Sequence, residues 1–182
     1  MGKHALILVD LQNDYFPAGK WPLHNIESAA QNAAQLLKRA RKFGELVIHV
    51  RHETPTEDAT FFIPDSEGAQ IHESVAPLNS EMVVLKNHAN SFRDTDLDSI
   101  LKREEIETVT VCGAMSHMCV DATVRAAYDL EYSVIVIDDA CATRDLQFRD
   151  FSLSAEQVHA TFMSALNGAY ATMTKTEEIL NS

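Results

Sequence analysis

The stretch Val109-Thr-Val-Cys-Gly-Ala-Met-Ser-His-Met-Cys-Val-Asp-Ala-Thr-Val-Arg-Ala-Ala127 changes its pattern halfway along. It begins with an apolar β-like run, Val109 to Cys112, which Gly113 interrupts. From about Cys119 the pattern is helical, and one face carries Val120, Thr123, Val124 and Ala127. The stretch therefore predicts a strand, a tight turn and a helix, with Cys119 at the N-terminus of the helix.

Cys119 has two interpretations at such a position. The unpaired N–H groups and the positive end of a helix dipole lower the pKa of a thiol and favour an accessible thiolate. Free cysteine is also often a small, buried and inert residue. The stretch alone leaves both interpretations open, so the rest of the chain decides.

Outward from this stretch, strand and helix patterns alternate along the chain. Continuous apolar runs are typical of strands covered on both faces, as in a parallel sheet. The pattern predicts an α/β protein with a right-handed parallel sheet and helices on both faces. The predicted strands are 5–9, 46–50, 82–85, 109–112, 133–137 and 170–174, and the predicted helices are 26–43, 97–101, 119–130, 154–167 and 176–180.

Three residues with complementary chemistry lie where predicted strands end. Asp10 follows the first strand, Lys86 follows the third, and Cys119 lies beyond the fourth. The carboxyl ends of parallel strands share one edge of the sheet, so these side chains are expected to meet in one crevice. A nucleophilic Cys needs a base and a cation, which Asp10 and Lys86 would supply. Taken singly, each has a simpler reading: Asp10 as a turn residue, Lys86 as a solvated charge.

The length, net charge and cysteine content of the chain restrict the class of protein to which it can belong. Its 182 residues suit a single domain, 1–182. A net charge of −12 makes nucleic acid and anionic membranes poor partners, and no apolar run is long enough to span a bilayer. The three cysteines form neither a disulfide frame nor a zinc motif, and the N-terminus has no signal-peptide pattern, so we expect a cytoplasmic protein.

Several segments of the sequence resemble the isochorismatase-like cysteine hydrolases, from about residue 4 to residue 176. They are Leu8-Val-Asp10-Leu-Gln-Asn-Asp-Tyr-Phe, Val84-Leu-Lys86 with Ser91-Phe92, the stretch from Gly113 to Ala127, Asp138 to Asp145, and the C-terminal helix with His159 and Leu166-Asn-Gly168. The resemblance implies a three-layer, Rossmann-like fold with a six-stranded parallel sheet of order 3-2-1-4-5-6.

The resemblance also implies the site and its chemistry. It implies a catalytic triad of Asp10, Lys86 and Cys119, a cis peptide between Ala114 and Met115, and an oxyanion hole formed by the N–H groups of Met115 and Cys119. The expected reaction is hydrolysis of an amide-type C–N bond in a small molecule through a thioester on Cys119. We expect no cofactor, and assembly of the chain into a homo-oligomer, a dimer or a tetramer.

The resemblance separates branches of that family. Nicotinamidases carry an Asp-x-His pair after the second strand for a metal, whereas this chain reads His49-Val-Arg-His52-Glu-Thr-Pro55, so we expect no metal. Isochorismatases that cleave a vinyl ether resemble this fold but lack the nucleophilic Cys. Cys119 therefore favours C–N hydrolysis, with vinyl ether hydrolysis as the alternative.

The substrate pocket is predicted from aromatic and histidine residues near the predicted strand ends. Each of them would fit equally well in the core or in a subunit interface. The predicted pocket residues are Phe16, Trp21, Phe61, Phe92 and His117, whereas Cys112, Cys141 and His159 are expected to be structural.

Three alternative hypotheses would place the protein in a different functional class. A catalytically silent α/β protein would show no reactive thiol. A nucleotide-binding Rossmann protein would need a glycine motif after the first strand, where this chain has Asp10-Leu-Gln-Asn13. A thiol redox protein would need a resolving cysteine, for which Cys112 and Cys141 stay open. The sequence does not identify the substrate.

Overall fold

The computed structural model describes residues 3–181 and is built around one parallel sheet. Its six strands lie in the order β3-β2-β1-β4-β5-β8, and every neighbouring pair is parallel. The predicted order is therefore confirmed, with β8 as the sixth strand. The bounds are β1 Lys3–Val9, β2 Leu46–His52, β3 Met82–Lys86, β4 Ile106–Ala114, β5 Ser133–Ala142 and β8 Thr172–Thr174.

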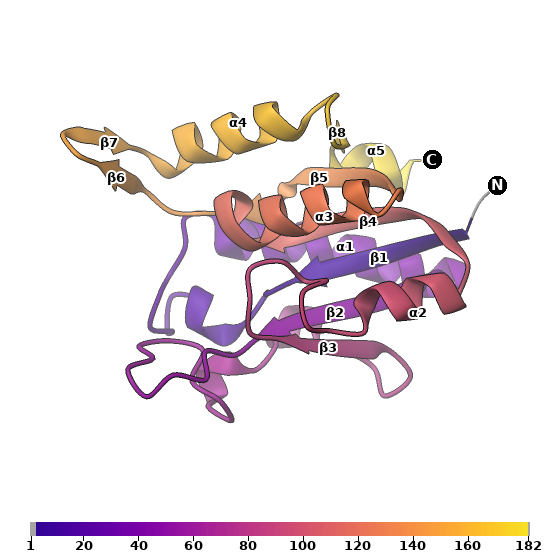
Figure 1. Ribbon diagram of the computed structural model, residues 1–182, viewed down its shortest axis with the longest axis horizontal. Helices are drawn as coiled ribbons and strands as arrows, with labels where there is room; N and C mark the ends of the chain where they lie inside the picture. The colour runs from indigo at the N-terminus through magenta and orange to yellow at the C-terminus, as the bar shows by residue number, and fades with distance from the viewer. Residues whose placement is uncertain (1–2, 182) are drawn as a thin grey trace.

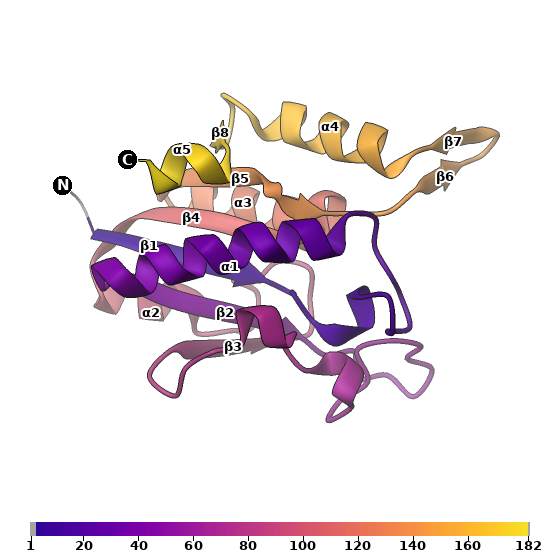
Figure 2. The same ribbon diagram turned by 180° about the vertical axis from the view of Figure 1, so that it is seen from behind.

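Helices cover both faces of this sheet, which gives the three layers that the sequence predicts. Helices α1 (Ile26–Phe43) and α5 (Thr176–Leu180) lie on one face, as Figure 2 shows. Helices α2 (Leu97–Arg103), α3 (Asp121–Asp129) and α4 (Ala155–Leu166) lie on the other (Figure 1). Each face has its own buried apolar cluster, so the strands are covered on both sides. Among the described residues, no helix is long and apolar enough to cross a membrane.

The sequence of α1, the longest of the described helices, determines which face is buried and where the helix ends. Seven apolar residues of α1 recur at spacings of mostly three and four and are buried, so one stripe faces the sheet, whereas Phe43 in the last turn is exposed. The helix ends where Gly44 adopts a left-handed conformation, with φ of 67°, and its N–H donates to the carbonyls of Ala40 and Arg41. The expected bounds 26–43 are those observed.

Gly113 lies near the end of β4, where β4 pairs with the end of β1 beside the predicted site. Its φ is 129°, and its register partner is Val9, directly before Asp10. A Cβ atom on Gly113 would collide with the backbone carbonyl oxygen of Val9. Only glycine lets the two strands approach so closely at this position.

Replacing Gly113 should therefore destabilise the fold more than replacing another glycine of positive φ. We expect Gly113→Ala to lower the free energy of unfolding by more than about 2 kcal/mol, because it adds a backbone collision to the conformational cost. Gly44→Ala is the matched control, since its Cβ would meet no atom within 4 Å, and should cost only about 1 kcal/mol. Urea unfolding measures both, and equal losses would contradict the steric argument.

Apart from the ends of several strands, two features differ from the predicted elements. Helical conformation starts at Ser116, not at about Cys119, because a π-helical turn (Ser116–Val120) precedes α3. A two-stranded antiparallel hairpin, β6 (Leu146–Phe148) and β7 (Phe151–Leu153), was not predicted. Both views show it projecting beyond the sheet together with the start of α4 (Figures 1 and 2).

The long segment between β2 and β3 contains two short 3-10 turns and is anchored by Asp14. The turns are Glu67–Ala69 and Glu73–Val75, and a third, Asn13–Tyr15, holds Asp14 itself. The buried Asp14 carboxylate accepts from the N–H of Phe62 at 2.7 Å and from that of Lys20 at 3.2 Å. Phe62 is buried and packs on Tyr15, so this segment packs against its own chain.

Candidate active site

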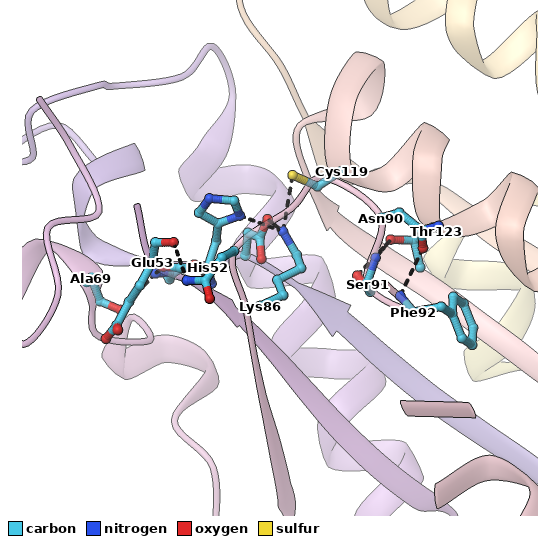
Figure 3. Close-up of polar contacts among 12 residues, drawn as sticks. His52, Glu53, Ala69, Lys86, Asn90, Ser91, Phe92, Cys119 and Thr123 are labelled. Atoms are coloured by element: carbon cyan, nitrogen blue, oxygen red, sulfur yellow. Dashed lines mark hydrogen bonds and ion pairs between the residues drawn. The ribbon is translucent and has the colours of Figure 1, made fainter. Parts of the chain in front are cut away.

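The carboxyl edge of the sheet gathers one polar side chain from each of four adjacent strands. In the spatial order of the strands these are Lys86 at the end of β3, His52 at the end of β2, Asp10 just after β1, and Cys119 five residues after β4. His52 and Lys86 are register partners in the parallel pair β2–β3. Because parallel strands end at one edge, residues distant in sequence become neighbours, as Figure 3 shows for His52, Lys86 and Cys119.

Lys86 lies at the centre of this group. Its Nζ lies 2.7 Å from Asp10 Oδ2, 2.9 Å from His52 Nδ1 and 3.3 Å from Cys119 Sγ. Asp10 and Lys86 are fully buried, and Cys119 is 6% exposed. The structure thus brings together the three residues that the sequence singled out as a triad.

The charges in this group follow from burial and from the ion pair. Burial lowers the pKa of Lys86, but the Asp10 carboxylate and the Cys119 sulfur outweigh it, so the pKa is raised above 10.5. Burial raises the pKa of the Cys119 thiol, the Asp10 carboxylate raises it further, and Lys86 opposes both. The resting group is therefore an ammonium with a neutral thiol beside it.

The thiol therefore differs from the sequence expectation of a lowered pKa. The helix terminus and Lys86 do favour the thiolate, but the packed core around Cys119 removes the water that would solvate it. Attack by this sulfur would need a base close by. Asp10 is suited to that task, because Lys86 occupies Oδ2 while Oδ1 is buried and accepts no hydrogen bond from the described residues.

The raised thiol pKa leads to a measurable alkylation profile. We expect iodoacetamide to label Cys119 slowly at pH 7, with a rate that rises about tenfold per pH unit to pH 10, because only the thiolate reacts. Free cysteine, with a pKa of about 8.5, should level off within that range and serves as the reference. Peptide mass mapping gives the rate at Cys119, and a plateau already reached by pH 7 would contradict a neutral resting thiol.

The turn that carries the nucleophile is tied to β5 and α4 by polar contacts. The peptide bond between Ala114 and Met115 is cis. The buried Ser116 hydroxyl lies 3.3 Å from the carbonyl oxygen of Ala142 and 2.8 Å from Nδ1 of His159. Nδ1 of His117 is hydrogen-bonded to Oγ1 of Thr143, 2.6 Å away. Ala142, the last residue of β5, and Thr143, which follows it, thus hold the turn that leads to Cys119.

This fold and this group of side chains have counterparts in known proteins. A scan against protein families matches residues 4–178 to the isochorismatase domain. The chain belongs to the isochorismatase family.

Relatives of this isochorismatase-family protein align over nearly its whole length. The uncharacterized isochorismatase family protein YddQ of Bacillus subtilis strain 168 is 53% identical over 176 residues, which cover 97% of this chain and 98% of YddQ. The crystal structure of a proposed isochorismatase hydrolase from Oleispira antarctica has a TM-score of 0.96 and 49% identity, and covers 100% of this chain and 97% of its own. The nicotinamidase of Escherichia coli K12 is 29% identical and covers 98% of this chain and 99% of its own.

Membership of the isochorismatase family gives a reaction class but no substrate. The protein is an isochorismatase-family hydrolase, and its relatives include a streptothricin hydrolase of Streptomyces noursei and the nicotinamidase. The Asp10, Lys86 and Cys119 group is compatible with such a reaction.

In this isochorismatase-family protein the residues predicted for the substrate pocket pack on different partners. Phe61 contacts Trp21, with ring centroids 5.0 Å apart, and the Arg144 guanidinium lies 5.1 Å from the centroid of the Trp21 ring. Phe16 is buried and stacks on His72 at 3.5 Å. His117 is half-buried on the nucleophile turn itself.

Phe92, the fifth residue predicted for the pocket, packs away from the other predicted residues. Its ring stacks against Tyr132, with centroids 6.3 Å apart, and packs on the core beneath α2 and α3. Figure 3 shows it turned away from Cys119. The neighbouring residue Ser91 is held by Thr123 of α3, which fixes this direction.

The isochorismatase-family site contains one residue that the sequence reasoning missed, His52. The predicted strand ended at Val50, so His52 was placed in the following loop, but β2 continues to His52. Its backbone is held by the buried side chain of Gln12, which accepts from the His52 N–H and donates to the His52 carbonyl, both at 2.8 Å. The signal was available: His52 is the polar residue at the end of the strand between those of Lys86 and Asp10.

Asp10, His52 and Cys119 each offer a donor atom, all within 4.8 Å of one another. Such a set would suit a metal ion in principle. Here the ammonium of Lys86 already lies within hydrogen-bond distance of all three side chains. A metal would have to displace Lys86, so the expectation of a metal-free site stays our prediction.

Proposed function

We propose that this protein hydrolyses an amide-type C–N bond of a small molecule through a thioester on Cys119. The observation that supports it best is the buried Lys86 ammonium, which contacts the Asp10 carboxylate and the Cys119 sulfur at once. A base, a cation and a thiol in contact are the requirements of a cysteine nucleophile. The amide named by its relative nicotinamidase supports the same bond class.

In the first half of the proposed reaction, Asp10 accepts the thiol proton and the Cys119 sulfur attacks the carbonyl carbon. A C–S bond forms, and the carbonyl oxygen takes up the electron pair as an oxyanion. The N–H groups of Met115 and Cys119 are proposed to hold it, a role typically worth about 10²- to 10³-fold per donor. When the oxyanion collapses the C–N bond breaks, and Asp10 returns the proton to the leaving nitrogen.

In the second half, water replaces the amine. Asp10 takes a proton from the water, whose oxygen attacks the thioester carbon, and the C–S bond breaks. The carboxylic acid leaves and Cys119 recovers its proton. Lys86 keeps its charge throughout and stabilises whichever of Asp10 and Cys119 is anionic. The proposed reaction requires only side chains and backbone N–H groups of this chain, together with water.

A screen for ammonia release from small amides and ureides tests the proposal. Wild-type protein should release ammonia from at least one member, and intact-mass spectrometry should detect the acyl adduct on Cys119 in rapidly quenched samples. Vinyl ethers belong in the same screen as the alternative chemistry. Turnover of a vinyl ether without any adduct on Cys119 would contradict the thioester route.

We also propose that the chain forms a homo-oligomer in which the β6–β7 hairpin is covered. Phe148 and Phe151 on this hairpin are 66% and 71% exposed. The apolar loop 61–63, which the sequence suggested for such an interface, packs instead on Tyr15 and Trp21 of its own chain. Sedimentation of the wild type against Phe148→Ser/Phe151→Ser tests this, and a wild-type monomer would exclude it.

A further inference from the structure

We propose that His52 is a positioning residue that holds the Lys86 ammonium in the orientation that the nucleophile needs. Its effect on turnover rests on the proposed function, whereas its effect on Lys86 does not. The argument uses the hydrogen-bonding capacity of Lys86, the ring of His52, and the contacts that fix that ring.

A buried ammonium needs an acceptor for each of its three protons. Lys86 has three acceptors within reach, and each comes from a different strand end: Asp10 Oδ2, Cys119 Sγ and His52 Nδ1. Losing one of them would leave an N–H unpaired in a site where Lys86 is 1% exposed. Such a loss disfavours the charged form of a buried group.

The contact with Lys86 also settles the tautomer of His52. An ammonium only donates, so Nδ1 of His52 must be the unprotonated, accepting nitrogen, and the neutral ring carries its proton on Nε2. Burial and then the charge of Lys86 lower the pKa of His52 to about 4, so the ring stays neutral at physiological pH. His52 is therefore a constant acceptor for Lys86.

The fold prevents His52 from turning away from Lys86. The two residues are opposite one another in the β2–β3 register. The side chain of Gln12 is hydrogen-bonded to both the N–H and the carbonyl of His52, and its amide also donates to the carbonyl of Ala69 at 2.8 Å. The His52 ring packs against Phe62, with centroids 5.9 Å apart. Removing the imidazole would thus remove an acceptor that the structure holds in place from two sides.

Three substitutions separate an acceptor at Nδ1 from a merely structural ring. Asparagine can place Oδ1 where Nδ1 lies, because both atoms are bonded to Cγ. Glutamine carries its amide one bond further out, and leucine has no acceptor. We therefore expect His52→Asn to keep the function of His52 and His52→Gln and His52→Leu to lose it. His4→Asn is the control, because His4 is exposed near the start of β1, at the opposite end of the sheet from Lys86.

The decisive measurement is the proton affinity of Lys86, followed by NMR of ¹³C- and ¹⁵N-labelled lysine and assigned with Lys86→Arg. We expect His52→Leu and His52→Gln to lower this affinity at least about tenfold, one pKa unit, and His52→Asn and His4→Asn to leave it near wild type. An unchanged affinity in His52→Gln would overturn the proposal. So would His52→Asn behaving like His52→Gln, and this comparison holds even where His52→Leu does not fold.

Turnover provides the second readout. On whichever amide the screen identifies, His52→Gln should lower kcat about 10- to 100-fold, less than the roughly 10²- to 10⁴-fold of a general acid or base, because His52 acts through Lys86. KM should stay within about twofold, and His52→Asn should recover most of kcat. Unchanged kcat in His52→Gln would contradict the proposal. If no amide is turned over, the proposed function fails, while the Lys86 titration still decides the role of His52.

Discussion

Cys119→Ala is expected to abolish turnover, by about 10⁴- to 10⁶-fold, the range seen when a nucleophile acting within a triad is removed. No other described side chain occupies the position of its sulfur beside Lys86. The fold should survive, since the change removes one atom from a side chain that packs at the edge of the core. Steady-state rates of ammonia release, together with urea unfolding, measure the two effects separately.

Cys112→Ala is the matched control for this substitution. Cys112 is a buried thiol on β4 that packs in the cluster beneath α1, and burial raises its pKa. Its loss should cost stability to a similar degree, about 1 kcal/mol for a small core truncation, while activity is retained. Full activity in Cys119→Ala, or equal loss in both variants, would contradict a nucleophilic role for Cys119.

The second large effect is expected from Lys86→Met. This variant leaves the buried Asp10 carboxylate without its cation, and breaking a buried pair typically costs about 3–5 kcal/mol. Because the pKa of Lys86 is raised above 10.5, its stabilisation is present in full at lower pH and is lost only as pH rises through the folded value. Urea unfolding at pH 7, where this stabilisation of the wild type is present in full, measures the deficit in unfolding free energy. Activity should fall at least about 10³-fold.

The double variant Lys86→Met/Asp10→Asn shows whether the unpaired charge causes the loss. With both charges removed, much of the stability should return, because a buried pair replaced by neutral groups is often nearly neutral in free energy. Activity should not return. A double variant as unstable as Lys86→Met would instead indicate that the side-chain volume of Lys86, rather than its charge, supports the fold.

The sheet and its helices were predictable because each strand and helix carries its own pattern. Helix α1 shows its apolar spacing and its Gly44 stop in the sequence itself. The β6–β7 hairpin was missed because its turn is formed by Arg149 and Asp150, with Arg149 at a φ of 54°. Arginine is an unfavourable residue in that conformation, so the sequence lacks the Asn-Gly type of signal.

The triad was predictable from the strand ends, whereas its electrostatics were not. Asp10, Lys86 and Cys119 follow strands whose patterns are clear, and a parallel sheet aligns those ends. The raised pKa of the thiol depends on how tightly distant segments close over Cys119, which no local pattern records. His52 was missed because the end of β2 was placed two residues too early. The direction of the Phe92 ring depends on contacts between Ser91 and Thr123, which are 32 residues apart in sequence and form no local pattern.

The placement of Lys86, His52 and Asp10 at adjacent strand ends restricts how the length of this chain can vary. In a strand, inserting or deleting one residue sends every following side chain to the opposite face. A single-residue deletion inside β1, β2 or β3 would thus point one of these residues into a helix layer. The tip of the β6–β7 hairpin, beyond the sheet, is free of that restriction. Insertions and deletions in related sequences should therefore be found at the hairpin and be rare within β1, β2 and β3.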